Sequence, residues 1–315
     1  MDRFVDILLW PLLACVSIGL LHSYAGLHVL RRGVIFVDLA LAQMAALGAV
    51  IGMVVTTHET HAHIQTVAPA QAPAPTDELD AAIAQTGQVS AQEPDDDDEQ
   101  HSQGLFDFWP TAFALAGALI LAFGRVPGER VPHEAIIGIV YVVAAAATIL
   151  ILSKAPHGHE QMEEMLTGKL LFVSRSEVIT TTAIYVVLGV LHWLFRRQFL
   201  AISKSSESAA QGGLRVYLWD CLFYAMFAVM VTRSVAIGGV LIVFSFLIIP
   251  GACASMLVDA FRARIFLAWV VATVVSLVGV SISAVADLPT GATLVATFGA
   301  ALIVCIALSA GRRAI

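Results

Sequence analysis

The residues of this chain that could do chemistry are polar side chains within long apolar stretches. They are His22, His28, Asp38, Gln43, His133, Glu134, His192 and Asp220. At such positions imidazole and carboxylate groups can bind a cation, relay protons or join neighbouring helices. The sequence contains no Walker-type phosphate loop, nucleophile elbow or His-Glu-x-x-His motif. The chain is therefore predicted not to be an enzyme, and no stretch of it resembles a nucleic-acid-binding surface.

Asp38 is the strongest candidate, because a carboxylate in an apolar membrane helix must face a partner or a wet cavity. It either pairs with Arg31 or Arg32 inside the bundle or forms part of a cation path. Gln43 lies roughly 140° around the same helix, so one ion could not easily bind both side chains. Gln43 could instead hydrogen-bond a neighbouring helix, and His28 is either a hydrogen-bonded core residue or a ligand. Asp38, Gln43 and His28 are the candidate translocation residues.

The elements that must position these residues are membrane helices. The 315 residues are 58% apolar and 13% charged, whereas soluble domains carry roughly 25% charged residues. Apolar runs of about 20 residues are long enough to cross a bilayer. We predict an all-α, polytopic transmembrane bundle that forms one domain over 1–315. Its nine spans, or eight if 217–257 is unbroken, are expected at about 4–30, 34–56, 108–124, 133–153, 178–195, 217–235, 237–257, 265–286 and 291–310.

The distribution of basic residues predicts the orientation. Lys and Arg are retained on the cytoplasmic side of a membrane protein. If nine spans alternate, Arg31, Arg32, Arg312 and Arg313 fall on one side, together with most of the other basic residues. The N-terminus is therefore expected outside and the C-terminus inside. The stretch 8–30 is too long, and lacks the small-residue site, for a cleaved signal peptide.

Residues 57–107 form an unusual connection between two spans. They contain eleven acidic residues and no Lys or Arg, which accounts for the net charge of −7. Such a segment cannot bury enough apolar surface to fold alone, so we predict a disordered extracytoplasmic loop. Its His58, His61, His63 and His101 could capture divalent metal at the outer surface. The alternative is a solvated acidic linker with incidental histidines.

Five stretches resemble the metal-type ABC transporter permeases, the membrane subunits of zinc, manganese and iron(II) uptake systems. They run from the N-terminal third to the last span, in the order found in that family. They are Gly26–Gly48, His133-Glu-Ala-Ile-Ile-Gly138, Leu166-Thr-Gly-Lys-Leu-Leu171, Gly238–Pro250 and Asp287-Leu-Pro-Thr-Gly291. The resemblance implies a bacterial inner-membrane permease, with no permanently bound cofactor and a divalent metal ion as transported substrate.

The same resemblance implies partners. It suggests a permease homodimer in the lipid bilayer, a separate cytoplasmic ATPase and an extracytoplasmic metal-binding protein. It also implies that the segment 250–264 couples to the ATPase, with Pro250, Gly251, Ala254 and Ser255 as the expected contact residues. Pro250 is expected to break or bend its span.

The second span departs from the family pattern. The family places an Asp and a His four residues apart, where this chain has Leu39 and Gln43. Amide oxygen is a poorer zinc ligand than imidazole. Either the metal site is built instead from Asp38, His28 and other residues, or the pore coordinates the transported substrate more weakly. The expected function is import of zinc or manganese. The alternatives are a metal chelate or vitamin as substrate, or an ATP-independent secondary carrier.

Overall fold

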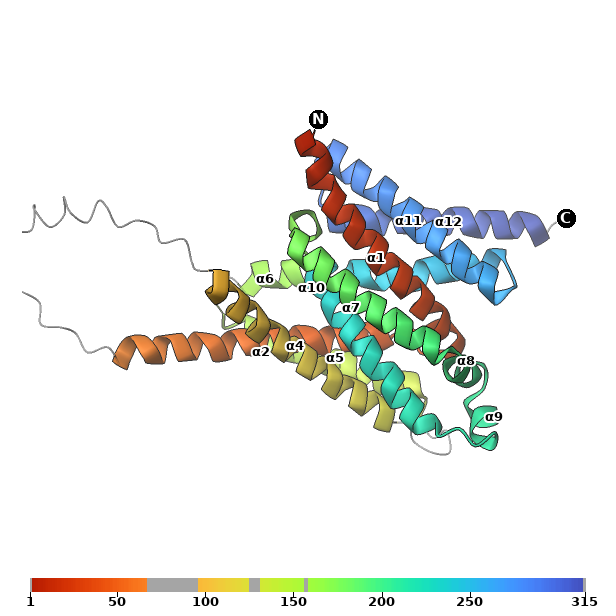
Figure 1. Cartoon of the computed structure of the whole chain (residues 1–315), viewed down its shortest axis with the longest axis horizontal. Coiled ribbons are helices and arrows are strands. Elements are labelled where there is room, and N and C mark those ends of the chain that lie inside the picture. The colour runs from red at the N-terminus through yellow and green to blue at the C-terminus, as the bar shows by residue number, and fades with distance from the viewer. Residues whose placement is uncertain (1, 67–95, 125–130, 156–157, 314–315) are drawn as a thin grey trace, which may run out of the picture.

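The computed structural model describes residues 2–66, 96–124, 131–155 and 158–313, with side chains at 8–55, 108–124, 131–155, 158–205, 208–209 and 211–312. Every regular element in these ranges is helical (Figure 1). They are α1 (Asp2–Arg32), α2 (Val37–Thr66), α4 (Asp96–Phe123), α5 (His133–Leu152), α6 (Gly158–Thr167), η1 (Leu170–Phe172), α7 (Arg175–Leu194), α8 (Arg196–Lys204), α9 (Ser206–Gln211), α10 (Val216–Leu257), α11 (Phe261–Ala286) and α12 (Thr290–Arg313).

The apolar helices confirm the predicted membrane bundle. Within the described residues, seven helices are long and apolar enough to cross a membrane, and Phe108–Phe123 is a shorter apolar helix. At 1.5 Å per residue, the 42 residues of α10 would span roughly 63 Å, about twice the hydrocarbon core of a bilayer. Gly239 divides α10, with φ 71° and ψ 167°. Counting α10 as two spans, the helices follow the nine predicted spans in order.

The two ends of the bundle differ in what holds them together. At one end, Arg32 pairs with Asp220, and Arg312 Nη1 donates to the Leu257 carbonyl over 2.7 Å. We call this the arginine end; in Figure 1 it lies toward the C-terminus, α8 and α9. At the opposite end, beside α6, Gly168 and Gly291 approach other segments backbone to backbone. We call this the motif end. Which end faces the cytoplasm stays a prediction from the basic residues.

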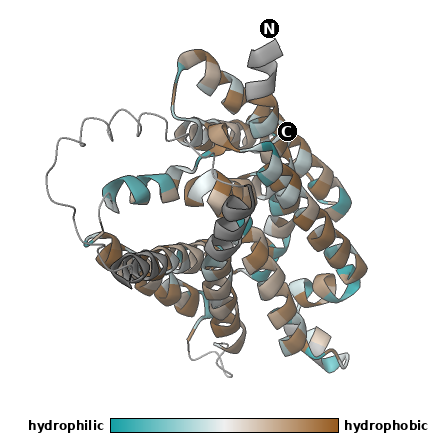
Figure 2. Ribbon diagram, turned by 60° about the vertical axis from the view of Figure 1, so that its left-hand side comes forward, coloured by the Kyte–Doolittle hydropathy of each residue, from teal (hydrophilic) through white to brown (hydrophobic). Residues whose placement is uncertain are grey.

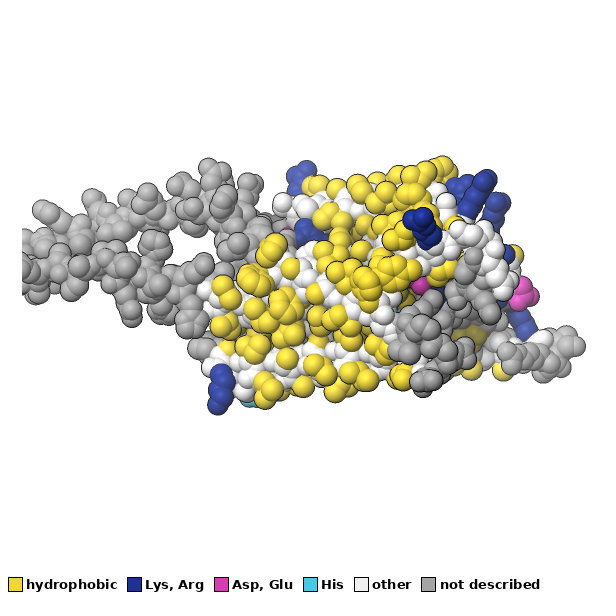
Figure 3. Space-filling view, turned by 90° about the horizontal axis from the view of Figure 1, so that it is seen from below, with side chains coloured by type: hydrophobic (Ala, Val, Ile, Leu, Met, Phe, Trp, Pro, Cys, Tyr) yellow, Lys and Arg dark blue, Asp and Glu magenta, His cyan; other side chains and the backbone are white. Residues whose placement is uncertain are grey.

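The core surrounds α10, which packs on α1, α2, α4, α11 and α12. Phe223, Phe227 and Phe246 of α10 are fully buried there. The outward faces of α5, α7, α11 and α12 are also apolar, with exposed Val, Ile and Leu side chains. Figure 2 shows hydrophobic residues along the long helices, and Figure 3 shows an apolar face with Lys and Arg mainly toward its ends. Helices with this pattern can contact lipid on one side and other helices on the opposite side.

The structure bears on two expectations, the loop 57–107 and the effect of Pro250. Helix α2 continues to Thr66 and α4 begins at Asp96, so helices enter both ends of the expected loop 57–107. Residues 67–95 lie outside the described residues, and disorder there stays a prediction. Pro250 does not end its helix, because α10 continues to Leu257. Pro250 is buried among other helices, a setting in which membrane helices tolerate proline, and a bend at Pro250 stays a prediction.

Candidate functional site

Small residues bring α2 close to α4. A Cβ atom on Gly48 would overlap the carbonyl of Trp109, and one on Gly52 would press on the Trp109 ring. On the facing helix, a Cβ atom on Gly117 would meet the side chain of Met44. Such contacts allow two helix backbones to approach closely in a membrane. They hold α2 inside the bundle.

Asp38 lies in the first turn of α2 and is 1% exposed. Its Oδ1 is buried and has no hydrogen-bond partner in the described part of the chain. Neither arginine of the preceding turn is its ion-pair partner: Arg32 binds Asp220, and Arg31 lies over the Phe261 ring at 3.9 Å from its centroid. A buried carboxylate oxygen without a partner is costly. Asp38 is thus not paired with either arginine, and its role in a cation path stays a prediction.

His28 and Gln43 have different surroundings from Asp38. His28 is buried, its Nδ1 lies 3.0 Å from the Ser203 hydroxyl of α8, and its ring meets Phe261 edge-on. Gln43 is half-buried on α2. In the described residues, no group of three or more His, Cys, Asp or Glu side chains could hold a metal ion. Metal ligation by Asp38, Gln43 and His28 therefore stays a prediction.

The histidines proposed for capture at the outer surface fall where only the backbone is described. His58, His61 and His63 belong to the last part of α2, and His101 belongs to the first part of α4. Their side chains lie outside the described residues. Their role therefore stays a prediction as well.

Three other polar residues of the spans make hydrogen bonds inside the bundle. Glu134 accepts a hydrogen bond from the Ile35 backbone N–H between α1 and α2, at 3.3 Å. His22 Nε2 lies 3.0 Å from the Ser234 hydroxyl, linking α1 to α10. His192 Nδ1 lies 3.1 Å from the Leu188 carbonyl of its own helix. Two of these contacts link neighbouring helices, and the third lies within α7.

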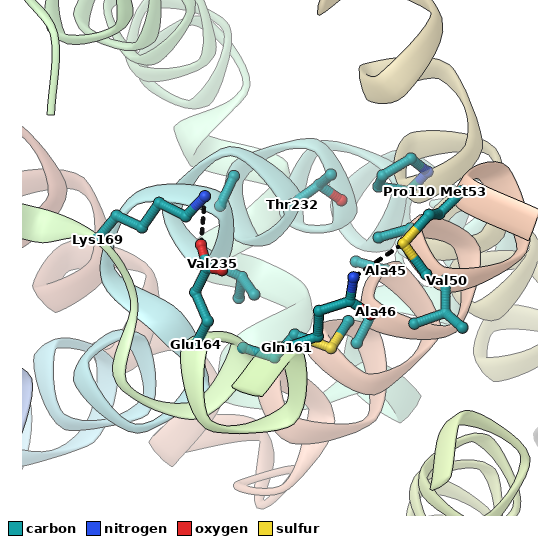
Figure 4. Close-up of a pocket in the computed structure, with 13 residues that line it drawn as sticks. Ala45, Ala46, Val50, Met53, Pro110, Gln161, Glu164, Lys169, Thr232 and Val235 are labelled. Atoms are coloured by element: carbon teal, nitrogen blue, oxygen red, sulfur yellow. Dashed lines mark hydrogen bonds and ion pairs between the residues drawn. The ribbon is translucent and has the colours of Figure 1, made fainter. Parts of the chain in front are cut away.

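A cavity of about 280 Å³ lies beside α2 toward the motif end (Figure 4). Gln161 Nε2 of α6 lies 3.0 Å from the sulfur of Met53, and Lys169 forms an ion pair with Glu164. The cavity is lined by Ala45, Ala46, Ala49, Val50, Met53, Pro110, Gln161, Glu164, Met165, Lys169, Thr232, Val235 and Ala236. It thus combines two thioethers, an amide, a hydroxyl and the Lys169–Glu164 ion pair with a mainly apolar wall.

Sequence reasoning did not select these cavity residues. Lys169 belongs to the Leu166–Leu171 stretch, which was identified only by resemblance. Met53 and Met165 have side chains that are typical of any apolar helix face. The weak signal was the amphipathic pattern of α6, in which Gln161 and Glu164 lie three residues apart and so share one helix face.

Three of the five motif stretches meet at the motif end. Gly168, with φ 71°, follows α6, and Gly239 is the break in α10. A Cβ atom on either would overlap the backbone of the other segment, and one on Gly291 would overlap the carbonyl of Thr167. The Lys169 backbone N–H donates to the Ile237 carbonyl over 3.0 Å. The segment after α6 is therefore held between the middle of α10 and the start of α12. We call these backbone contacts of Gly168, Gly239 and Gly291 the clamp.

The residues expected to contact an ATPase lie mostly inside the protomer. Pro250, Gly251 and Ala254 are buried, and Ser255 is half-buried. Gly251 lies against Leu27 and Leu30 of α1. No short helix follows Pro250, since α10 is joined to α11 by residues 258–260. The exposed positions of the segment 250–264 are Asp259, Ala260, Arg262 and Ala263.

Comparison with known proteins identifies the family. Residues 106–309, well over half of the chain, match the ABC 3 transport family. The chain belongs to the ABC 3 transport family. The match begins near the middle of α4 and ends near the end of α12. It therefore contains the clamp and most of the helices around it.

Relatives and solved structures agree with this ABC 3 assignment. The chain is 27% identical over 167 residues to a "Probable iron transport system membrane protein" of Haemophilus influenzae, covering 53% of this chain and 59% of the relative. It is 27% identical over 183 residues to the "Manganese transport system membrane protein MntC" of Listeria monocytogenes, covering 58% and 65%. These alignments thus span about three fifths of each relative.

The fold is similar to a structure titled "PsaBC from Streptococcus pneumoniae in complex with Fab". The TM-score is 0.70 at 16% identity, and the match covers 96% of this chain and 94% of that one. At this level of identity the likeness concerns the fold alone. The ABC 3 protein described here is therefore a multi-pass helical membrane protein with the architecture of that chain, and the two relatives named above are bacterial.

Proposed function

We propose that this protein is the membrane permease subunit of an ATP-binding cassette importer for a divalent metal ion. The observation that carries the proposal is the match of residues 106–309 to the ABC 3 transport family. The names of the relatives favour manganese or iron as substrate. Zinc, which the sequence resemblance also suggested, has no support from these names.

We infer that the substrate passes along α2. The cavity at the motif end offers the sulfurs of Met53 and Met165 and the carboxylate of Glu164 on its wall. Such mixed donors bind a transition metal weakly, as a path requires. Asp38 lies about 20 Å further along α2 from Met53, and its buried carboxylate offers a second binding point. The metal is the transported substrate, and the protein needs no resident cofactor.

Three partners follow from this role. The ATPase would bind at the arginine end, where α8, α9 and residues 258–260 offer exposed polar groups. A metal-binding protein would deliver the substrate to the motif end, beside the cavity. A second copy of the chain would complete the importer as a homodimer.

The decisive test is metal uptake in bacterial cells that lack their own zinc, manganese and iron(II) importers. The permease is expressed with its ATPase and binding protein, and a matched strain carries an ATPase with an inactivated catalytic glutamate. Accumulation of manganese, iron or zinc that requires the active ATPase supports the proposal and identifies the metal. Accumulation that needs a proton gradient but no ATPase would instead establish a secondary carrier.

A second candidate substrate is a metal chelate or a vitamin. The mainly apolar wall of the α2 cavity favours it, since an organic ligand can bury surface there that a bare ion cannot. Competition separates the two. If excess free manganese or iron(II) suppresses uptake, the ion is the substrate. If only a chelate competes, the metal-ion proposal is wrong while the importer architecture stands.

A further inference from the structure

A second and larger hollow lies on the other side of the bundle. It has a volume of about 1,170 Å³, and α1 forms its floor with α7 and α11 as its walls. Figure 1 shows α1 running between α7 and α11. Its lining is almost wholly apolar and includes Trp10, Leu13 and Leu20 of α1 and Val186 of α7. It shares no lining residue with the cavity beside α2, so we call it the α1 groove and treat it separately from the transport path.

The arginine end of the α1 groove is basic. Arg196 and Arg262 line it there, at the starts of α8 and α11. The Arg196 guanidinium lies 4.6 Å from the centroid of the Trp193 ring and donates to the Trp193 carbonyl over 3.4 Å. In the part of the chain that the structure describes, neither arginine forms an ion pair with a carboxylate. Two exposed cations thus lie where an apolar groove opens.

An exposed tryptophan lies beside the basic mouth: Trp193, next to Arg196, is 64% exposed. About two turns along α11 from Arg262, Trp269 donates its Nε1–H to the Leu20 carbonyl of α1 over 2.9 Å. Tryptophan is enriched where the apolar core of a bilayer meets the headgroups. The basic mouth therefore lies at headgroup depth, and the apolar part of the groove extends from it into the hydrocarbon region.

We propose that the α1 groove binds an anionic glycerophospholipid, with its phosphate at Arg196 and Arg262 and its acyl chains along α1. From Tyr24 to Trp10 the floor is about 21 Å long, which exceeds the roughly 15 Å of one hydrocarbon leaflet. The volume exceeds the 300–1,000 Å³ of typical small-ligand sites, as two acyl chains require. Basic pockets between membrane helices on the cytoplasmic side are known to bind anionic headgroups.

The groove also has room at its centre. Gly189 of α7 lines it, and a Cβ atom there would meet only Leu21, at 4.0 Å. Ala183, one and a half turns away, is exposed. A transmembrane helix of a second copy of this chain could use the same small residues, but it would leave both arginines without an anion. The charge at the mouth therefore favours a lipid over a helix.

The test is native mass spectrometry of the purified full-length permease with its ATPase, after incubation with phosphatidylglycerol or phosphatidylcholine. Wild-type protein is expected to retain phosphatidylglycerol selectively. Arg196→Ala with Arg262→Ala should lower its affinity by about thirtyfold, since each basic residue at the membrane surface contributes roughly fivefold. The matched control is Arg197→Ala with Arg215→Ala, which removes two exposed charges of the same connection that do not line the groove.

A second variant tests the apolar part. Gly189→Leu fills the groove and leaves both arginines in place, so it should displace bound lipid of either kind while the protein elutes as a single species. Equal retention of both lipids by the wild type, or no loss in the double arginine variant, would overturn the proposal. Disulfide cross-linking of Ala183→Cys between two copies in membranes, above the wild-type background, would show a helix in the groove and overturn it too.

Discussion

The motif end and the arginine end hold the same helices together in different ways. At the motif end, Gly168, Gly239 and Gly291 allow backbone to meet backbone. At the arginine end, Arg32 bridges α1 and α10 through its charge to Asp220 and lies over the Phe223 ring at 3.9 Å. A backbone contact has no adjustable atoms, whereas a side-chain contact can be replaced by another pair. The two ends should therefore respond differently to substitution and to rescue.

The largest effect is expected from Gly239→Ala at the motif end. Its φ of 71° and ψ of 167° lie in a region that is essentially restricted to glycine, and a Cβ atom would overlap the backbone of Leu166 and Gly168. We expect a loss of about 4 kcal/mol or more in the free energy of unfolding. Thermal unfolding in detergent measures it.

The matched control for Gly239→Ala is Gly138→Ala. A Cβ atom at Gly138 meets nothing within 4 Å, so this change should be neutral or slightly stabilising in a helix. If Gly239→Ala were as stable as Gly138→Ala, the clamp would not be a steric requirement. No second substitution at Gly168 is expected to rescue Gly239→Ala.

At the arginine end, Arg32→Met should cost about 3 kcal/mol, because it leaves Asp220 buried without its cation. The two side chains are only 2% and 4% exposed and lie 2.8 Å apart. Asp220→Leu alone should cost a similar amount. The double variant should be clearly more stable than the sum of the two, since apolar pairs often replace buried ion pairs.

A double-mutant cycle on purified protein measures this coupling between Arg32 and Asp220. Additive losses would mean that the pair does not act as a unit. In that case the contrast with the motif end would disappear, and the packing of Arg32 on Phe223 would carry the stabilisation instead.

Asp38→Asn should affect transport far more than stability. The change keeps the size of the side chain and removes a buried charge, so the free energy of unfolding should fall by less than about 1 kcal/mol. ATP-dependent metal uptake should be lost if the carboxylate binds the passing ion. Uptake assays normalised to the protein in the membrane check this. Normal uptake by Asp38→Asn, with Leu39→Ala as control, would make Asp38 a packing residue.

The smallest effect on stability is expected from Lys169→Met. Its ion pair with Glu164 is exposed, at 64% and 39% for the two side chains, and such pairs contribute roughly 0–1 kcal/mol. Any effect should appear in metal uptake, because the change leaves the Glu164 carboxylate free at the α2 cavity. A large loss of stability would instead place Lys169 in the clamp through its side chain.

The sequence predicted the helices well but their contacts poorly. Apolar length predicted α1 and α2 and both halves of α10, because span length depends on local composition. Asp38 was found because a carboxylate in an apolar stretch stands out. The Asp220 partner of Arg32 was missed, since the two lie 188 positions apart. Pro250 was expected to break or bend its span; α10 continues past it to Leu257, and a bend there stays a prediction.

The sequence by itself thus determined a polytopic helical membrane protein, its spans and its resemblance to metal-type permeases. These properties follow from hydropathy and from short stretches, which each segment carries independently of the others. Only the tertiary structure decided that three motif stretches form one clamp, that Met53 and Glu164 share a cavity, and that Arg196 and Arg262 line one groove. Such groupings depend on how the helices pack, and neighbours in sequence do not encode them.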